Sequence, residues 1–166
     1  MQQNFRLHPG GVPDIFGCIM GSTFCSLHYH IVFSTKERRP IIRAEWRQQL
    51  HEYLGGTIRG LGGVAEMVGG VADHVHLLVS LKTVDAPAEI VRELKKASSV
   101  WAVEKYDRLF SWQEGYAIFS ASSTHCPALN HYIAGQEEHH RQLPFADELK
   151  RLLEKNGVSC DPKFLA

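Results

Sequence analysis

The sequence lacks a net charge, because its 18 Lys and Arg residues balance its 18 Asp and Glu residues. Such a chain has no overall field that attracts nucleic acid, so a nucleic-acid partner would need a local basic patch. Long apolar runs are also missing, which argues against a membrane partner. The first residues lack the basic start and continuous apolar block of a signal peptide. We therefore expect a soluble, cytoplasmic protein.

Cysteine is scarce and scattered. Cys18, Cys25, Cys126 and Cys160 form no C-x-x-C pair, and no two of them share a short zinc-binding spacing. This distribution predicts reduced thiols, with neither a disulfide framework nor a structural zinc site.

Apolar residues, aromatics included, make up 44% of the chain, which is enough for the core of one domain. Alternation predicts strands at 24–35, 64–70, 73–81 and 115–122, and helical spacing predicts helices at 41–61, 88–106, 126–143 and 145–156. The order β-α-β-β-α-β-α, followed by a C-terminal helix, indicates an α+β fold. We expect a ferredoxin-like antiparallel sheet with helices on one face.

Three segments are expected along the chain. Residues 1–22 have no clear period and contain four glycines and two prolines, which predicts a disordered region or an extension. Residues 23–142 carry the domain, and residues 143–166 form a C-terminal helix and tail. That helix could pack on the core or on a second copy of the chain.

Two histidines stand one residue apart in the strand "VADHVHLLVS". Side chains alternate along a strand, so His74 and His76 project from one face while Val75 and Leu77 project from the other. If the apolar set packs on helices, both imidazoles lie on the open face, where they could bind one divalent ion. Inert polar residues on a solvated face remain an equal alternative. A histidine triad hydrolase would need a third histidine where Leu78 stands, and a cupin would need more strands.

A second pair of polar residues lies on the helix that contains "YIAGQEEHHR". Tyr132 and Gln136 are four apart and share one helix face. A tyrosine near an ion that polarises a phosphate can attack phosphorus, and a glutamine carbonyl can complete the coordination of that ion. A half-buried aromatic residue beside a surface glutamine is the plainer alternative.

Taken together, the two pairs resemble a known family. The stretches "LHYHIVFSTKERRP", "GGVADHVHLLVSL", "WQEGYAIFS" and "YIAGQEEHHR" are similar, in order and spacing, to IS200/IS605-type transposases, the single-tyrosine (Y1) members of the HUH nucleases. The resemblance implies an RRM-like HUH nuclease fold across 23–142. It also implies a transposase that cleaves single-stranded DNA through a 5′-phosphotyrosine and rejoins strands at hairpin-marked element ends.

The resemblance also implies roles for particular residues. His74, His76 and Gln136 would bind Mg²⁺ or Mn²⁺, Tyr132 would be the nucleophile, and no nucleotide cofactor would be needed. The partners would be single-stranded DNA with hairpins and a second copy of the chain, in a homodimer whose two subunits could share their active sites.

Further candidates surround this set. Basic residues that could contact DNA phosphates are Lys36, Arg38, Arg39, Arg43, Arg47, Lys95 and Lys96. Candidates for outer positions around the metal are Asp73, His28, His30 and His140. His139 and His140 are expected to be exposed or to contact DNA, although His140, one turn beyond Gln136, could reach the metal region.

Three rival functions remain. A domesticated relative would process repeated hairpin sequences of its host, and an inactive descendant would only bind DNA hairpins. A small-molecule metal hydrolase is the third, and it would leave Tyr132 without a role.

Overall fold

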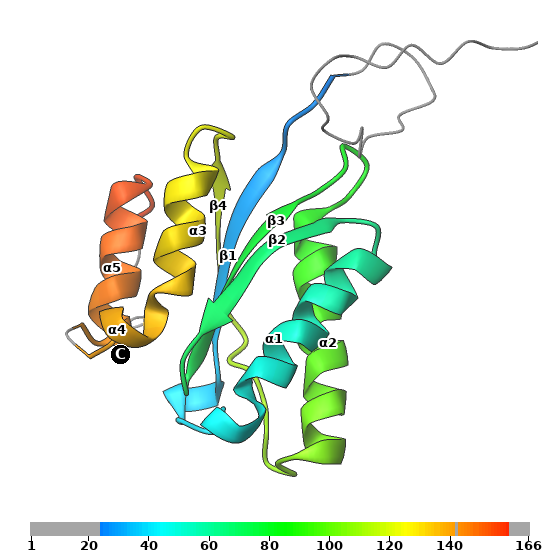
Figure 1. Ribbon diagram of the computed structural model, residues 1–166, viewed down its shortest axis with the longest axis vertical. Helices are drawn as coiled ribbons and strands as arrows, with labels where there is room; N and C mark the ends of the chain where they lie inside the picture. Colours follow the sequence, from blue (N-terminus) through cyan, green and yellow to red (C-terminus); the bar gives the residue numbers. More distant parts are fainter. Residues whose placement is uncertain (1–23, 142, 160–166) are drawn as a thin grey trace, which may run out of the picture.

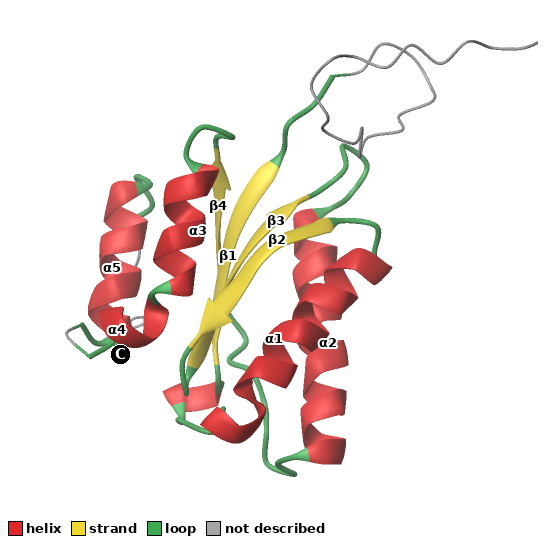
Figure 2. Cartoon of the chain, in the orientation of Figure 1, coloured by secondary structure: helices red, strands yellow, loops and turns green. Residues whose placement is uncertain are grey.

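A computed structural model describes residues 24–141 and 143–159, so the expectations for residues 1–22 and for the end of the tail lie outside the described residues. Four strands form one antiparallel sheet in the order β2-β3-β1-β4 (Figures 1 and 2). Their bounds are β1 His28–Ser34, β2 Val64–Gly70, β3 His74–Ser80 and β4 Ala117–Ala121. The ferredoxin-like α+β topology is confirmed.

The main core lies between this sheet and two long helices, α1 (Ala44–Gly60) and α2 (Pro87–Lys105), which cover one face (Figure 1). The strands contribute every second side chain to this core, including Ile31 and Phe33 of β1 and Val75 and Leu77 of β3. Burying each of these side chains stabilises the fold by roughly 1.5–3 kcal/mol. The period of two therefore assigns the opposite side chains, His30, His74 and His76, to the other face.

That other face is covered as well, which corrects the expectation of helices on one face. α3 (Cys126–Ala134), α4 (Gln136–His139) and α5 (Phe145–Lys155) lie across the sheet from α1 and α2 (Figure 2). A smaller apolar cluster of Leu78, Leu129 and Ile133 joins α3 to β3. The helix predicted at 126–143 is interrupted at Gly135, where α3 ends. His74 and His76 consequently lie under helices rather than on an open face.

Within the ranges that the structure describes, no helix is long and apolar enough to cross a membrane. The short 3-10 turn η1 (Lys36–Arg38) follows β1, and Thr35 forms an isolated antiparallel bridge with Trp112. Thr35 also donates hydrogen bonds to the Asp73 carbonyl through its backbone N–H and its hydroxyl, and these hydrogen bonds hold η1 beside the start of β3.

The partly buried His51 of α1 should make the stability of the fold sensitive to acid. Burial, with help from the charge of Arg47, lowers the pKa of His51 from 6.5 to about 4. Below pH 6.5 the unfolded chain therefore gains a proton that the folded chain does not gain until about pH 4. As the pH decreases across this window, His51 should reduce the free energy of unfolding by about 1.4 kcal/mol per pH unit. Denaturant titrations between pH 7 and 4 should show that the free energy of unfolding falls less steeply with decreasing pH in His51→Gln than in the wild type. An identical slope in both proteins would contradict the prediction.

Candidate active site

The two histidines of β3 are fully buried and held in place by their neighbours. Asp73 Oδ1 lies 2.7 Å from His74 Nδ1, and His30 Nε2 lies 2.9 Å from His76 Nδ1. In both rings the Nδ1 atom is therefore occupied and the Nε2 atom points to the space beneath the helices. Outer partners of this kind fix the ring orientation and tautomer of metal-binding histidines.

The α3–α4 segment brings its two predicted residues to the same space. Gln136 is buried, and its Oε1 lies 3.4 Å from His74 Nε2. The Tyr132 ring stands edge-on to the His76 ring, with 5.8 Å between centroids. Thus one chain brings together His74, His76, Tyr132 and Gln136, which the sequence places up to 62 residues apart.

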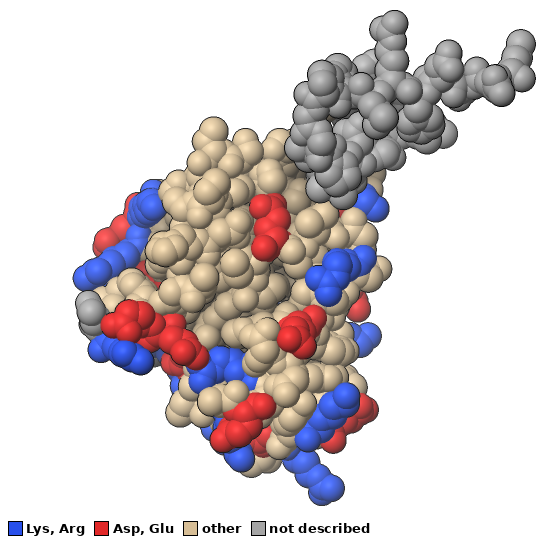
Figure 3. All heavy atoms as spheres, in the orientation of Figure 1, with Lys and Arg blue, Asp and Glu red and all other residues tan. Residues whose placement is uncertain are grey.

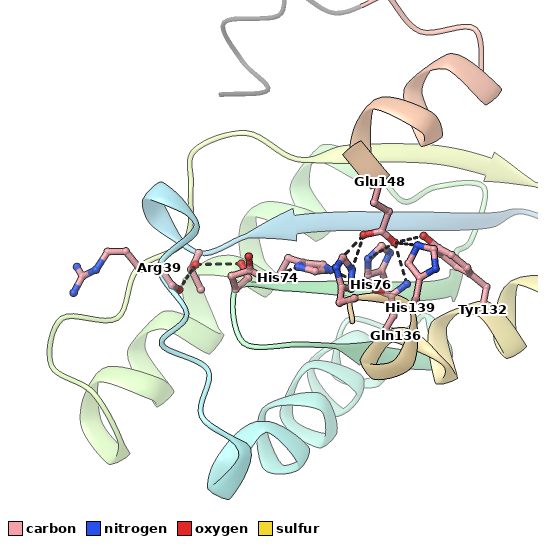
Figure 4. A network of polar contacts seen from close by, with 10 residues as sticks. Arg39, His74, His76, Tyr132, Gln136, His139 and Glu148 are labelled. Carbon is pink, nitrogen blue, oxygen red and sulfur yellow. Dashed lines mark hydrogen bonds and ion pairs between the residues drawn. The ribbon is translucent and has the colours of Figure 1, made fainter. Parts of the chain in front are cut away.

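Glu148 of α5 completes the group, and it was not among the predicted site residues. Its carboxylate points from α5 toward the histidines (Figure 4). Oε1 accepts hydrogen bonds from the Tyr132 hydroxyl and, at 3.0 Å, from Gln136 Nε2. A sequence signal existed, because Glu148 interrupts an apolar stripe formed by Phe145, Leu149 and Leu152. An acid in such a stripe is expected to be buried with a partner.

The residues present suit a divalent cation. His76 Nε2 lies 3.5 Å from Glu148 Oε1, and His74 Nε2 lies 3.6 Å from Oε2. Two ligand atoms that each lie about 2.1 Å from one ion at a tetrahedral angle are about 3.4 Å apart. His76 Nε2 is buried without a hydrogen bond, as a ligand atom beside a cation would be. Together with His140, these residues form a group whose ligand atoms lie within 4.8 Å of one another.

The protonation states of the buried side chains suit a bound cation. Burial lowers the pKa of His76 to about 4 and, with His76 beside it, that of His30 to about 3, so both rings are neutral at pH 7. A neutral imidazole has the lone pair that a metal needs. Burial opposes ionisation of Glu148, but its contacts with His140, His76 and Tyr132 outweigh burial and hold its pKa well below the usual range. Burial and Glu148 raise the pKa of Tyr132, which stays protonated.

Two of the predicted outer residues, His140 and His28, and the neighbouring His139 differ in their surroundings. His140 is mostly buried, which corrects the expectation of exposure; its ring packs 4.4 Å from that of His74, and its Nε2 lies 2.8 Å from Glu148 Oε2. His139 is one-third exposed, with Nε2 3.8 Å from Glu148 Oε1. The ring of His28 instead contacts Glu66 and Ser26.

The predicted DNA-binding residues fall into two groups. The first lies around η1 and the start of α1, where Arg38 packs over the Phe145 ring at 5.8 Å and Arg47 pairs with Glu137 at 2.7 Å. The members of this group are Lys36, Arg38, Arg39, Arg43 and Arg47. The second group is Lys95 and Lys96 of α2. Lys95 donates hydrogen bonds to the backbone carbonyls of residues 113–115, so its ammonium group is engaged within the protein.

Two clefts flank α5, and the first of them reaches the site. One, of about 290 Å³, lies between α3 and α5 and is lined by Tyr132, Glu148, Arg151 and Lys155, among others. The other, of about 410 Å³, includes Arg38 and Phe145. On the face shown in Figure 3, Lys and Arg side chains alternate with Asp and Glu around a central area of other residues. Positive charge is thus local rather than continuous on this face.

Gly69 of β2 sets the distance between the sheet and α3. A Cβ added at Gly69 would lie 2.5 Å from the backbone oxygen of Ile133, the residue after Tyr132. We expect Gly69→Ala to displace α3, to destabilise the fold by about 1–3 kcal/mol and to impair any activity that uses Tyr132. Gly60→Ala is the control, because an added Cβ meets nothing within 4 Å there. Denaturant unfolding measures the difference; equal stability of the two variants would contradict the prediction.

Comparisons with known proteins point to one family. Residues 23–136 match the family model described as "Transposase IS200 like". The ISDra2 transposase TnpA of Deinococcus radiodurans is 26% identical over 119 residues, covering 68% of this chain and 85% of that protein.

Solved structures share the fold. A crystal structure of a D. radiodurans R1 protein assigned as a transposase has a TM-score of 0.59 at 22% identity and covers 70% of this chain and 95% of that one. A REP-associated tyrosine transposase bound to a REP hairpin has a TM-score of 0.55 at 15% identity, with 75% and 74% covered. Because the family model spans more than half of the sequence, this chain belongs to the IS200-like transposase family.

Proposed function

We propose that this protein is a metal-dependent single-strand DNA endonuclease and strand transferase in which Tyr132 is the nucleophile. The observation that carries the proposal is the convergence of Tyr132, His74, His76 and Gln136 on one buried carboxylate, Glu148. A small-molecule metal hydrolase would not explain a tyrosine in this position.

The covalent step uses groups that the structure brings together. Tyr132 Oη attacks the scissile phosphorus, the bond from phosphorus to the 3′ oxygen breaks, and the 5′ phosphate stays on the tyrosine. Glu148 accepts the hydrogen bond of the Tyr132 hydroxyl and orients it, and the tyrosine proton passes to the departing 3′ oxygen as the bond breaks. Attack by another 3′ hydroxyl reverses these steps and rejoins the strands, so no nucleotide cofactor is required.

His74, His76 and Gln136 would hold the cation, with Glu148 and His140 within reach of the same position. When bound, Mg²⁺ or Mn²⁺ would supply neutralising charge at the scissile phosphate. Asp73 and His30 keep the two ligand nitrogens pointed at that position. Tyr132 faces the histidines of its own chain in this structure. We also propose a homodimer in which the α3 helix of one subunit brings its Tyr132 to the histidines of the other.

We propose that DNA phosphates contact the basic residues around η1. Replacing Arg38 and Arg39 together by Ala should weaken binding of hairpin DNA and reduce its salt dependence. If two phosphate contacts on single-stranded DNA are lost, the slope of log K against log salt should fall by about 1.4. Arg92→Ala is the control, since Arg92 pairs with Glu89 and Glu93 on α2. An unchanged slope in the double variant would remove these arginines from the interface.

The decisive experiment incubates the protein with single-stranded oligonucleotides from the DNA flanking its gene, with Mg²⁺ or Mn²⁺, on a denaturing gel. We expect a covalent protein–DNA adduct that a chelator prevents, and peptide mapping should place the DNA on Tyr132. An adduct on another residue would overturn the assignment of the nucleophile. Tight hairpin binding without any adduct would favour the inactive DNA-binding descendant.

A further inference from the structure

A second group of metal-binding side chains lies on the α3 face of the sheet and shares no residue with the active site. It consists of His28 of β1, Glu66 of β2 and Cys126, the first residue of α3. Their ligand atoms lie within 4.8 Å of one another, and His28 Nδ1 is 2.5 Å from Glu66 Oε1. Cys126 is buried, whereas the other two side chains are about four-fifths buried.

A β-bulge in β2 places the acid in this group. Ala65 pairs with Val79 and Met67 pairs with Leu78, so Glu66 is an extra residue in the strand. Both Glu66 and Met67 can then face α3, where Met67 packs with Leu78 while Glu66 reaches His28. A bulge interrupts the hydrogen-bond ladder and commonly redirects a side chain at a functional position. Here it adds a carboxylate without removing Met67 from the packing of α3.

The histidine has an outer partner, as metal ligands usually do. Ser26 Oγ lies 3.0 Å from His28 Nε2, on the opposite side of the ring from Glu66. This contact leaves Nδ1 directed at Glu66. The Cys126 thiol donates a hydrogen bond to the Ser122 carbonyl at 3.3 Å, which a bound cation would replace. Burial, and then the charge of Glu66, raise the pKa of the Cys126 thiol. A divalent cation would relieve this repulsion, since a thiolate and a carboxylate together balance its charge.

We propose that His28 Nδ1, the Glu66 carboxylate and Cys126 Sγ form a second, thiolate-containing metal site for a Zn²⁺-class cation. Thiolate and imidazole ligands select Zn²⁺ over Mg²⁺, and three protein ligands leave a fourth position for water. The spacing of cysteines gave no indication of this site, because its ligands come from three elements that are distant in sequence.

The position of the site assigns it a structural role. Cys126 opens α3, and Tyr132 lies six residues further along the same helix. Metal bound there would attach the first turn of α3 to β1 and β2 of the same chain. If Tyr132 is the nucleophile, as the proposed function holds, the site anchors the helix that carries it.

The test uses the full chain with Cys18, Cys25 and Cys160 changed to Ser, so that Cys126 is the one remaining thiol. Titration with Co²⁺, a spectroscopic substitute for Zn²⁺, should produce a saturable thiolate-to-cobalt charge-transfer absorption, which only a cation bound to Cys126 can give. Cys126→Ser should abolish this absorption, and Glu66→Gln or His28→Gln should weaken Co²⁺ binding at least about tenfold. Adding His74→Ala and His76→Ala should leave it unchanged, which separates this site from the active site.

Zn²⁺ should also raise the Tm of the single-cysteine protein, and the shift should be smaller with Glu66→Gln. Glu52→Gln, an exposed change on α1, is the matched control and should retain the shift. The proposal is overturned if the single-cysteine protein shows no charge-transfer absorption, or if Glu66→Gln and His28→Gln bind Co²⁺ as tightly as their parent. These measurements need no DNA, so their outcome does not depend on whether Tyr132 is the nucleophile.

Discussion

Replacing Tyr132 by Phe is expected to abolish the covalent DNA adduct and to reduce strand cleavage by at least about 10³-fold. The change removes only the hydroxyl, so the ring can keep its edge-on contacts with His30, His76 and His139. The fold and the metal ligands should remain in place, and hairpin binding should be nearly unchanged. Quantifying the adduct on a denaturing gel, beside hairpin affinity, separates loss of chemistry from loss of binding.

A matched control is available in Tyr53→Phe, which removes a hydroxyl from α1 in the main core layer and keeps its stacking on Trp101. This variant should form the adduct at the wild-type rate. Persistence of the adduct in Tyr132→Phe would show that another residue is the nucleophile, and it would remove the main support for the proposed mechanism.

Glu148→Gln is expected to have the second largest effect. Glutamine preserves the shape of the side chain but removes the negative charge that faces His74, His76 and His140, and it removes the charged acceptor that orients the Tyr132 hydroxyl. We expect divalent-cation affinity to fall roughly 10- to 100-fold, as it does when a group supporting a metal site is lost. Adduct formation should fall at least as far, even with saturating Mn²⁺, because the tyrosine hydroxyl loses its charged acceptor.

The control for this variant is Asp147→Asn, the same chemical change at the neighbouring, exposed position of α5. It should leave metal affinity and adduct formation unchanged. If Glu148→Gln instead cleaved DNA faster than the wild type, Glu148 would act as a cover that obstructs the site. Its proposed part in the chemistry would then be wrong.

The strands and helices, and the face on which each of their side chains lies, were predictable because they depend on side-chain periods over a few residues. Alternation along β1 and β3 placed Ile31 and Val75 on one face and His30 and His76 on the other, and the structure agrees. The four-residue spacing of Tyr132 and Gln136 likewise put both on one side of their segment, even though the helix breaks at Gly135. The resemblance to transposases added the expectation that these two pairs meet.

Long-range packing was not predictable in the same way. A helix such as α5 presents an apolar stripe, but the stripe does not say which surface it covers, and the sequence left open whether that surface was this chain or a second copy. Glu148 was therefore missed, and the burial of His74, His76 and His140 was not foreseen. The hydrogen bonds from Lys95 to the backbone carbonyls near residue 114 were not predictable either, because their acceptors lie far along the chain.

The sequence by itself determined the family, the strands and helices, and the face of the sheet on which each histidine lies. Tertiary structure alone decided that α3, α4 and α5 close over that face, that Glu148 enters the site, and that His28, Glu66 and Cys126 meet. The physical reason is the range of the interactions. Side-chain periodicity follows from backbone geometry over a few residues, whereas the meeting of three distant elements depends on how complete surfaces fit together.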